Sequence, residues 1–373
     1  MTSEDATAVR AATVLTASGP LSPGEVVIDG AVIVEVRPST GAVTHEVLAP
    51  GFVDLQMNGN DAVDVADADD DGWAALDAAL LAQGVTTWCP TLVSAPLGQM
   101  EASLGRIARA AARPPEGRPA IAGAHLEGPF LAVAGAHDPA LLHRSVDRRW
   151  LASLPPAVAV VTLAPELPGA LEAVGDLADA GVLVALGHTG SSFEVAGEAA
   201  EAGARLVTHL GNAMGPFRQR EPGILGAALA DDRLAVSLIA DLVHVHRALL
   251  RIAFRAKGPG RVVLVTDAVA TGGPAPPGRE PPRLADGTLV GSVLEMDRAV
   301  ANTVSGAGIA LAAAVAAAST TPAGLLGLDD RGAIVPGRRA DLVALGRDLS
   351  VEKVWVGGQV AWPAPPLNLG DRR

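Results

Sequence analysis

The sequence predicts an α/β fold, a (β/α)8 TIM-like barrel accompanied by a small β-sandwich domain built from both termini. From residue 51 onward, short apolar runs alternate with amphipathic runs, which is the pattern of repeated strand–helix units. Near both ends of the chain, alternating runs separated by Gly and Asp turns indicate strands without such helices. Acidic or imidazole side chains follow four of the apolar runs, at the strand ends where barrel enzymes place their reactive groups.

Eight Val-, Leu- and Ala-rich runs are expected to be parallel strands buried on both faces. They span residues 51–55, 84–89, 120–126, 157–163, 182–187, 205–209, 235–240 and 261–266. The amphipathic runs between them predict helices, among them 72–83, 97–113, 167–180 and 193–202, with Gly84, Gly181 and Gly203 as C-terminal stops. Eight such units in succession favour a closed barrel over an open sheet.

The two ends of the chain predict a separate β domain. Residues 26–28 and 31–36 flank Asp29-Gly30, which favours a hairpin with a type I′ turn. Strands are also expected at 341–345, 351–356 and 359–362, so residues 1–49 and 333–373 together would form the small domain and residues 50–332 the barrel. The Pro- and Gly-rich stretch 272–283 is expected to be a loop after the last barrel strand.

The composition excludes several classes of function. A net charge of −13, a pI near 5 and 3% aromatic residues without any Tyr argue against binding to nucleic acid or to an anionic membrane. Cys89 is the single cysteine, so an internal disulfide is excluded and a reducing compartment is expected. Residues 1–10 lack the apolar core of a signal peptide, and the longest apolar stretch, 307–318, is shorter than the roughly 20 residues that cross a bilayer. We therefore expect a cytoplasmic protein.

Three of the strand-end residues have the chemistry of metal ligands. Glu127, His188 and His209 offer one carboxylate and two imidazoles, and three such ligands leave a position open for water in catalytic zinc sites. A single histidine at a strand end is more often structural, but two on consecutive strands with a carboxylate on an earlier one favour a metal site. His125 lies two residues before Glu127 and so faces the same side of its strand, either as a ligand or as a group that orients one.

Asp267 ends the eighth strand. An aspartate there could simply cap a following helix. Beside a metal site, however, it is placed to take a proton from water and to return it to a leaving group. We expect Asp267 to be this general base.

Several motifs identify the chain as similar to a known family. They occupy residues 50–59, 125–130, 135–137, 187–189, 208–210 with 212–214, 220–223, 240–241, 243–245 and 265–268. With these motifs the chain resembles the amidohydrolase superfamily and, within it, the N-acetylglucosamine-6-phosphate deacetylase family. The resemblance implies hydrolysis of the acetamide of N-acetyl-D-glucosamine 6-phosphate, in amino-sugar catabolism.

The resemblance also implies one divalent metal ion per subunit. In the wider superfamily a His-x-His pair ends the first strand and binds a second ion, whereas Gln56 and Asn58 stand there in this chain. Amides bind zinc poorly compared with imidazole. Zn²⁺ is the expected ion, with Fe²⁺ or another divalent ion as the alternative.

The substrate pocket implied by the family covers several loops, and the active unit implied is a homodimer. Arg220 would reach over from the neighbouring subunit and bind the 6-phosphate, for which the guanidinium fork is suited. His137 and His244 would lie near the acetamide and the sugar. The other residues expected to bind substrate are Ala136, Asn212, Ala213, Asp241, Leu289, Val290 and Gly291.

Two departures from the family pattern leave the substrate open. The segment between Glu127 and His137 is short, so His137 is expected to be displaced, and Leu242 replaces a Gly whose backbone freedom a Leu should forbid. N-acetylgalactosamine 6-phosphate, or another N-acyl sugar phosphate, is therefore the alternative substrate, and an inactive barrel that serves as a binding protein is the more distant one. The acidic stretch from Asp61 to Asp71 lacks the spacing of a calcium loop and is expected to be a solvated lead-in to a helix.

Overall fold

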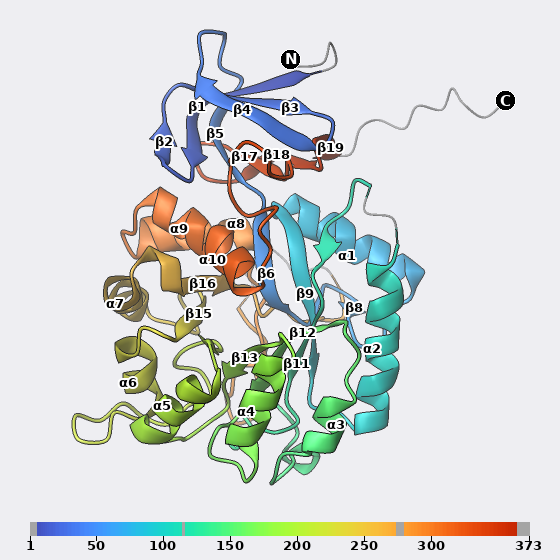
Figure 1. The fold of residues 1–373 in the computed structure, drawn as a ribbon, viewed down its shortest axis with the longest axis vertical. Helices are drawn as coiled ribbons and strands as arrows, with labels where there is room; N and C mark the ends of the chain where they lie inside the picture. Colours follow the sequence, from blue (N-terminus) through green and yellow to red (C-terminus); the bar gives the residue numbers. More distant parts are fainter. Residues whose placement is uncertain (1–5, 114–115, 274–279, 364–373) are drawn as a thin grey trace, which may run out of the picture.

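The computed structural model describes residues 6–113, 116–273 and 280–363. A β sheet formed by both ends of the chain lies at one end of the molecule, and the helices and parallel strands of the barrel make up the rest (Figure 1).

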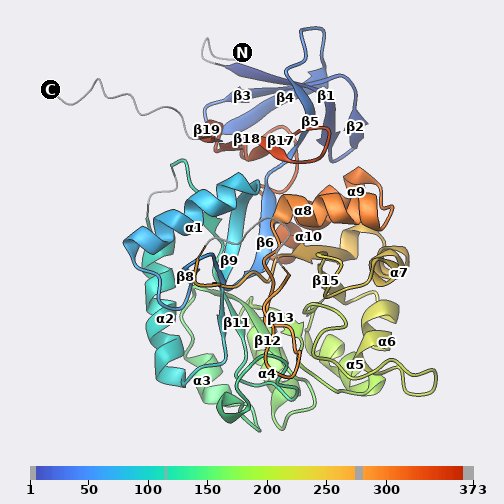
Figure 2. The same ribbon diagram turned by 180° about the vertical axis from the view of Figure 1, so that it is seen from behind.

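The barrel strands are parallel and follow one another in chain order (Figure 2). Each pairs with the next, and the two-residue β10 (Ala120–Ile121) pairs with the second strand, β9. They are β6 (Phe52–Met57), β9 (Val85–Val93), β11 (Ala124–Glu127), β12 (Val158–Leu163), β13 (Leu183–Leu186), β14 (Leu206–Val207), β15 (Ala235–Ile239) and β16 (Val262–Val265). The predicted barrel is confirmed, although β14 is shorter than the run 205–209 suggested.

The seam between the first strand, β6, and the last, β16, is closed by bonds that involve the residues just after each strand and one side chain. The amide of Asp267 donates to Gln56 O at 2.8 Å, and the amide of Asn58 donates to Ala268 O at 2.8 Å. The buried Asp54 side chain also spans the seam, because its Oδ2 accepts from Thr266 Oγ1 at 2.6 Å. This seam fixes Asp267 against the end of β6.

Helices surround the strands, and their caps and stops follow from local sequence. Asp69 and Ser192 cap α1 and α5 by accepting from backbone amides, and Gly84, Gly181 and Gly203 follow helices with positive φ, as expected. The helices are α1 (Asp70–Ala82), α2 (Leu97–Ala111), α3 (Arg148–Ala152), α4 (Ala170–Asp179), α5 (Phe193–Ala202), α6 (Gly223–Ala230), α7 (Arg247–Lys257), α8 (Met296–Ala301), the π-helix η3 (Asn302–Gly306), α9 (Leu311–Ala318) and α10 (Thr320–Leu325).

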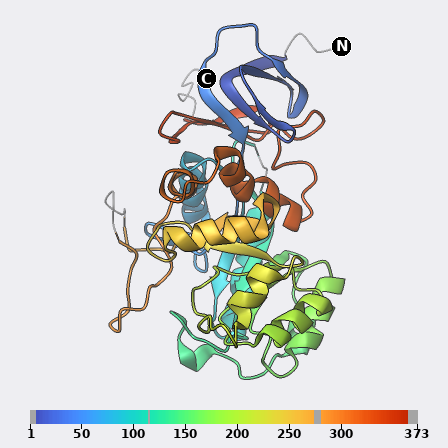
Figure 3. The same ribbon diagram turned by 90° about the vertical axis from the view of Figure 1, so that its left-hand side faces the viewer.

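The terminal sheet joins strands from both ends of the chain, as predicted. Its order is β19-β18-β17-β5-β1-β3-β4, with β2 beside β1, and most pairs are antiparallel. Figure 3 shows the blue N-terminal strands curving over the red C-terminal ones. The strands are β1 (Thr7–Thr16), β2 (Gly19–Leu21), β3 (Gly24–Asp29), β4 (Val32–Pro38), β5 (His45–Pro50), β17 (Leu342–Leu345), β18 (Val351–Val356) and β19 (Gln359–Trp362).

This sheet has a hydrophobic core of its own. Val14, Val26, Ile33, Leu48 and Trp355, which come from five different strands, are buried together in it. Residues from both termini are thus needed to complete one apolar cluster, so neither end could form this core alone.

Two local expectations need comment. The hairpin of β3 and β4 turns at Gly30 and Ala31, because Asp29 pairs with Val32, and of these turn residues Gly30 alone has a positive φ, of 57°. The predicted type I′ turn is therefore wrong, since that turn needs positive φ at both central residues. Part of the expected loop 272–283, residues 274–279, lies outside the described residues. Among the described helices, none is long and apolar enough to cross a membrane.

Candidate active site

The structure brings together four residues at the carboxyl ends of strands β11, β13, β14 and β16, namely Glu127, His188, His209 and Asp267. Glu127 Oε1 lies 2.8 Å from His209 Nε2 and 3.3 Å from His188 Nε2. Gln56 Nε2 donates to Glu127 Oε1 at 3.0 Å and to Asp267 Oδ1 at 3.1 Å, so one amide bridges the two carboxylates. All five side chains are buried. The parallel strands thus deliver their end residues to a single centre.

Three of these residues have a left-handed backbone. The φ angles are 49° at His188, 33° at His209 and 49° at Asp267. Each such non-glycine residue costs roughly 1–2 kcal/mol, and conformations of this kind concentrate at functional sites. The chain therefore bends abruptly at each strand end, at a cost in stability.

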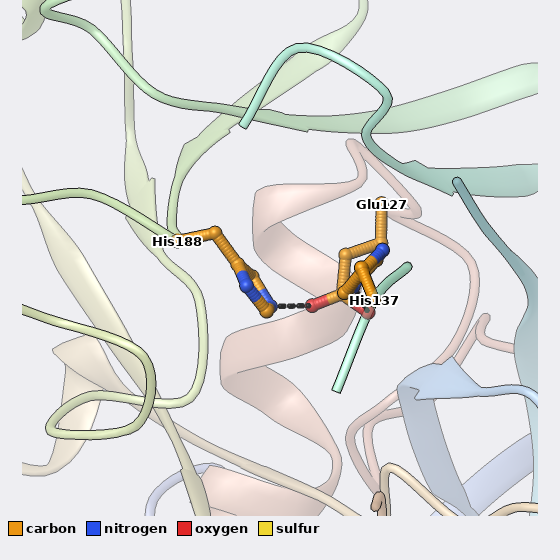
Figure 4. A group of neighbouring side chains, drawn as sticks. All are labelled: Glu127, His137 and His188. Carbon is orange, nitrogen blue, oxygen red and sulfur yellow. Dashed lines mark ion pairs between the residues drawn. The ribbon is translucent and has the colours of Figure 1, made fainter. Parts of the chain in front are cut away.

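His137 joins the same centre, from the loop that follows β11. Its Nε2 lies 3.8 Å from Glu127 Oε2, and its ring meets that of His188 edge-on with centroids 4.5 Å apart. Figure 4 shows Glu127, His137 and His188, whose potential ligand atoms all lie within 4.8 Å of one another. The sequence had suggested that the short loop displaces His137, but in the structure the loop brings His137 to Glu127.

The buried carboxylate and imidazoles of this centre shift one another's pKa values. Burial works to raise the pKa of Glu127, but hydrogen bonds and charge from His188 and His209 hold it well below its usual range. Burial lowers the pKa of His137 to about 4, so that its ring is neutral. His188 donates from Nδ1 to Val133 O at 2.9 Å, which leaves the lone pair on Nε2, the nitrogen nearest Glu127. Although burial opposes it, the hydrogen bond and charge of Glu127 raise the pKa of His209, so a divalent ion bound at its Nε2 would displace a proton there.

The centre is also crowded with nitrogen atoms that compete for one oxygen. Gln56 Nε2, His188 Nε2 and His209 Nε2 all approach Glu127 Oε1, while the buried Nδ1 of His209 has no hydrogen-bond partner among the described residues. A cation would give these imidazole lone pairs and the carboxylate a common partner, and the residues present therefore fit one metal ion.

Asp267 lies next to this group and is held by amides. Asn58 Nδ2 donates to Asp267 Oδ1 at 2.8 Å, in addition to the bond from Gln56. Burial, followed by repulsion from Glu127, raises the pKa of Asp267 to about 6. Gln56 and Asn58 thus orient the carboxylate of Asp267.

His125 belongs to the barrel interior and not to the ligand group. Its Nδ1 bonds to Leu55 O at 2.9 Å and its Nε2 to Thr162 Oγ1 at 2.7 Å, and Thr162 in turn pairs with Thr208 Oγ1 at 2.8 Å. Both ring nitrogens are occupied, which leaves neither for a metal ion.

A cavity of about 510 Å³ opens over the centre. Besides the carboxylates and imidazoles above, it is lined by most of the residues expected to bind substrate, namely Ala136, His137, Asn212, Ala213, His244, Leu289, Val290 and Gly291. Ser94 and Asp138 also line the cavity, although the sequence pattern did not predict them. Ser94 Oγ pairs with His137 Nδ1 at 2.9 Å. Asp64, on the short strand β8 (Val63–Asp64), also lines the cavity, and it is exposed, as expected of the acidic stretch before α1.

Asp241 acts through a neighbour. It does not line the cavity; its Oδ2 bonds to Nδ1 of His244 at 2.7 Å. Although burial opposes it, this contact lowers the pKa of Asp241, and the pair leaves Nε2 of His244 available in the cavity wall. Leu242, between them, has a φ of 65°, so the expectation that Leu forbids the glycine conformation is wrong, and the chain adopts it at a cost in strain.

Arg220 lies apart from the cavity. It is exposed in a second depression of about 510 Å³, which is lined by residues 190–194, 215–216, 218 and 220–223. Within one chain, Arg220 therefore does not contribute to the wall of the cavity above Glu127.

Comparison with known proteins matches residues 47–361 to the Amidohydrolase family. The chain is 37% identical to N-acetylgalactosamine-6-phosphate deacetylase of Escherichia coli O157:H7, over 95% of this chain and 98% of that protein. It is 38% identical to N-acetylglucosamine-6-phosphate deacetylase of Danio rerio, over 85% of each. Among solved structures, N-acetyl-D-glucosamine-6-phosphate deacetylase of Mycobacterium smegmatis, in complex with N-acetyl-D-glucosamine-6-phosphate, superimposes with a TM-score of 0.88 at 33% identity, over 95% of this chain and 99% of that one.

Proposed function

Since this chain belongs to the amidohydrolase family, we propose that it hydrolyses the acetamide of N-acetyl-D-glucosamine 6-phosphate to D-glucosamine 6-phosphate and acetate. One observation supports this most: the side-chain amide of Gln56 bridges the carboxylates of Glu127 and Asp267. These carboxylates lie beside two strand-end histidines and line the cavity. Metal-dependent amide hydrolysis uses an activated water and an adjacent base, and this arrangement supports both. Relatives with this activity match the chain over most of its length.

We assign the metal to Glu127, His188 and His209, with His137 as the residue that would replace or join His209. A divalent ion bound there, Zn²⁺ by our expectation, supplies Lewis-acid activation of water and of the amide carbonyl. The single set of ligands, with amides at Gln56 and Asn58, supports one ion per subunit.

Asp267 is the proton carrier. Its Oδ1 is occupied by Asn58 and Gln56, so Oδ2 is the oxygen left to accept the proton of the attacking water. With a pKa of about 6 the carboxylate is ionised near neutrality, and once protonated it delivers the proton to the departing amine.

His244 is the better placed of the two cavity histidines to hydrogen-bond the acetamide or the sugar. Its ring is fixed by Asp241, whereas His137 is turned toward Glu127 and Ser94. The loop of Leu289, Val290 and Gly291 forms another part of the wall.

The galacto epimer is the second candidate substrate. The relative from Escherichia coli O157:H7, which matches over 98% of its own length, is named for N-acetylgalactosamine 6-phosphate. Assaying acetate release from both epimers, together with metal analysis of the purified protein, tests the proposal. Preference for the galacto epimer would select the second candidate, and failure to hydrolyse either would leave a binding protein.

We further propose that the active unit is a homodimer in which Arg220 binds the 6-phosphate in the neighbouring subunit's site. The distance of Arg220 from its own cavity supports this, because an exposed guanidinium outside the cavity is free to meet a partner. The lone, buried Cys89 supports a cytoplasmic location.

A further inference from the structure

The turn that connects β15 to α7 brings His244 to the cavity in a strained conformation. Asp241 Oδ1 accepts from the amides of Val243 and His244 at 2.9 and 2.8 Å, and Leu242 between them has a positive φ. Leu242 and Val243 are both partly exposed, so the turn is not held by burial of its own side chains. A strained turn of this kind persists only when its surroundings support it.

The π-helix η3 provides that support. Asn302 Nδ2 donates to the buried carbonyl of Ala240 at 3.0 Å, at the first residue of the turn. The side chain of Leu242 lies against Gly306, since a Cβ on that glycine would be 2.9 Å from Leu242 Cδ1. Single turns of π-helix occur often at functional sites.

A third contact joins the same segment to the helix that follows the turn. Arg251 Nε, in α7, donates to Ala307 O at 2.9 Å, directly after η3. The π-helix is therefore tied to the start of the turn, to its strained centre and to the helix after it.

We propose that η3 is a brace for the turn from Ala240 to His244, and that Asn302 is a positioning residue that sets His244 in the cavity wall. The proposal rests on the proposed function, because it takes His244 to contact the substrate. Removal of the Asn302 donor takes away the hydrogen bond at the buried carbonyl where the turn begins, and the turn then relaxes away from the cavity.

The test compares Asn302→Asp with Ser305→Ala. The first keeps the side-chain shape but sets an oxygen against the carbonyl of Ala240. The second removes a bond within η3, from Ser305 Oγ to Ala301 O, and so serves as the matched control. We expect kcat/KM to fall roughly 5- to 20-fold in Asn302→Asp and to stay near wild type in Ser305→Ala, with metal content unchanged in both. Asn302→Ala, which only deletes the donor, is used if the aspartate variant does not fold.

Two further readouts separate positioning from general damage. Adding Asn302→Asp to His244→Ala should lower activity no further than His244→Ala alone, because both act through one side chain. Hydrogen exchange at residues 241–246 should be faster in the Asn302 variant than in the Ser305 control. Losses that multiply in the double variant, or unchanged exchange, would overturn the brace. The exchange result does not depend on activity, so a wild-type protein inert on both sugar phosphates would refute the proposed function alone.

Discussion

Replacing Asp267 by Asn is the most direct test of the mechanism, because it removes the proton acceptor and little else. Oδ1 already accepts hydrogen bonds from Asn58 and Gln56, at 2.8 and 3.1 Å, and an amide oxygen at that position accepts them equally. The amide nitrogen would then occupy the position of Oδ2, where it cannot take a proton. We expect the fold and the metal site to survive.

The size of the loss follows from the role of the group. General acid–base catalysis contributes a factor of roughly 10²–10⁴ in rate, so kcat should fall by a factor in that range or by more. KM should change much less, since the proton is transferred only in the chemical steps.

The pH dependence gives a second measure of the same group. Burial and the charge of Glu127 raise the pKa of Asp267 to about 6, and the base must be ionised to act. The kcat/KM of the wild type should therefore fall as the pH drops through about 6, and a cation beside Glu127 would move this limb to lower pH. The acid limb should be absent in whatever activity Asp267→Asn retains.

The assay is acetate release across pH 4.5–9, with metal content measured in parallel. Asp138→Asn is the control, because Asp138 lines the same cavity but caps a short helix by accepting from Ala140 N, which an amide oxygen also does. If Asp267→Asn kept more than about half of the wild-type turnover, another residue would be the base and the mechanism would be wrong.

Three further predictions address metal binding, phosphate binding and stability. His209→Ala should lose metal and activity together, whereas His137→Ala should keep the ion if Glu127, His188 and His209 are the ligands; elemental analysis decides, and the opposite pattern would exchange the two histidines. Arg220→Ala should raise KM with kcat changed far less, because the phosphate contact is made in ground and transition states alike. Mixing this variant with Asp267→Asn should restore activity if the two subunits share their sites. Mixed dimers that form but show no restored activity would place Arg220 in its own chain's site. Burial raises the pKa of Asp54 to about 7, from 3.8, so its contribution to the free energy of unfolding is full below about pH 4 and is lost as the pH rises to about 7. Asp54→Asn should therefore flatten the change in urea midpoint between pH 5 and pH 8, and an undiminished slope would assign it to other groups.

The barrel and the position of its reactive groups could be predicted because both depend on local pattern. Buried parallel strands are continuous apolar runs, and a polar residue directly after such a run must lie at the same rim as the others. For this reason the sequence alone predicts that Glu127, His188, His209 and Asp267 lie close together.

What could not be predicted depends on the paths of loops and on backbone angles. The approach of His137 to Glu127 is set by how the intervening loop folds, and a residue count gives only its length. Asp64 is exposed, as expected, but nothing local distinguishes it from its acidic neighbours, so its place in the cavity wall on a two-residue strand could not be predicted. The left-handed conformation of Leu242 occurs in a turn that Asp241 and η3 hold. The π-helix η3 is distant in sequence, and the hydrogen bonds of Asp241 cannot be predicted from residue propensities.

The pairing of β5 with β17 has a consequence for how this protein is made. Leu342 lies opposite Pro50 and Leu345 opposite Val47, with the entire barrel between them in the chain. During synthesis, the edge of β5 that pairs with β17 therefore stays without its hydrogen-bonding partner until the barrel segment has been synthesised. Because β5 leads directly into β6, the sheet can close only after the barrel segment has been synthesised, and it then joins the chain segments before and after the barrel. A nonsense or frameshift change just before residue 342 would therefore leave every reactive group in place and yet yield a chain with an exposed, aggregation-prone strand.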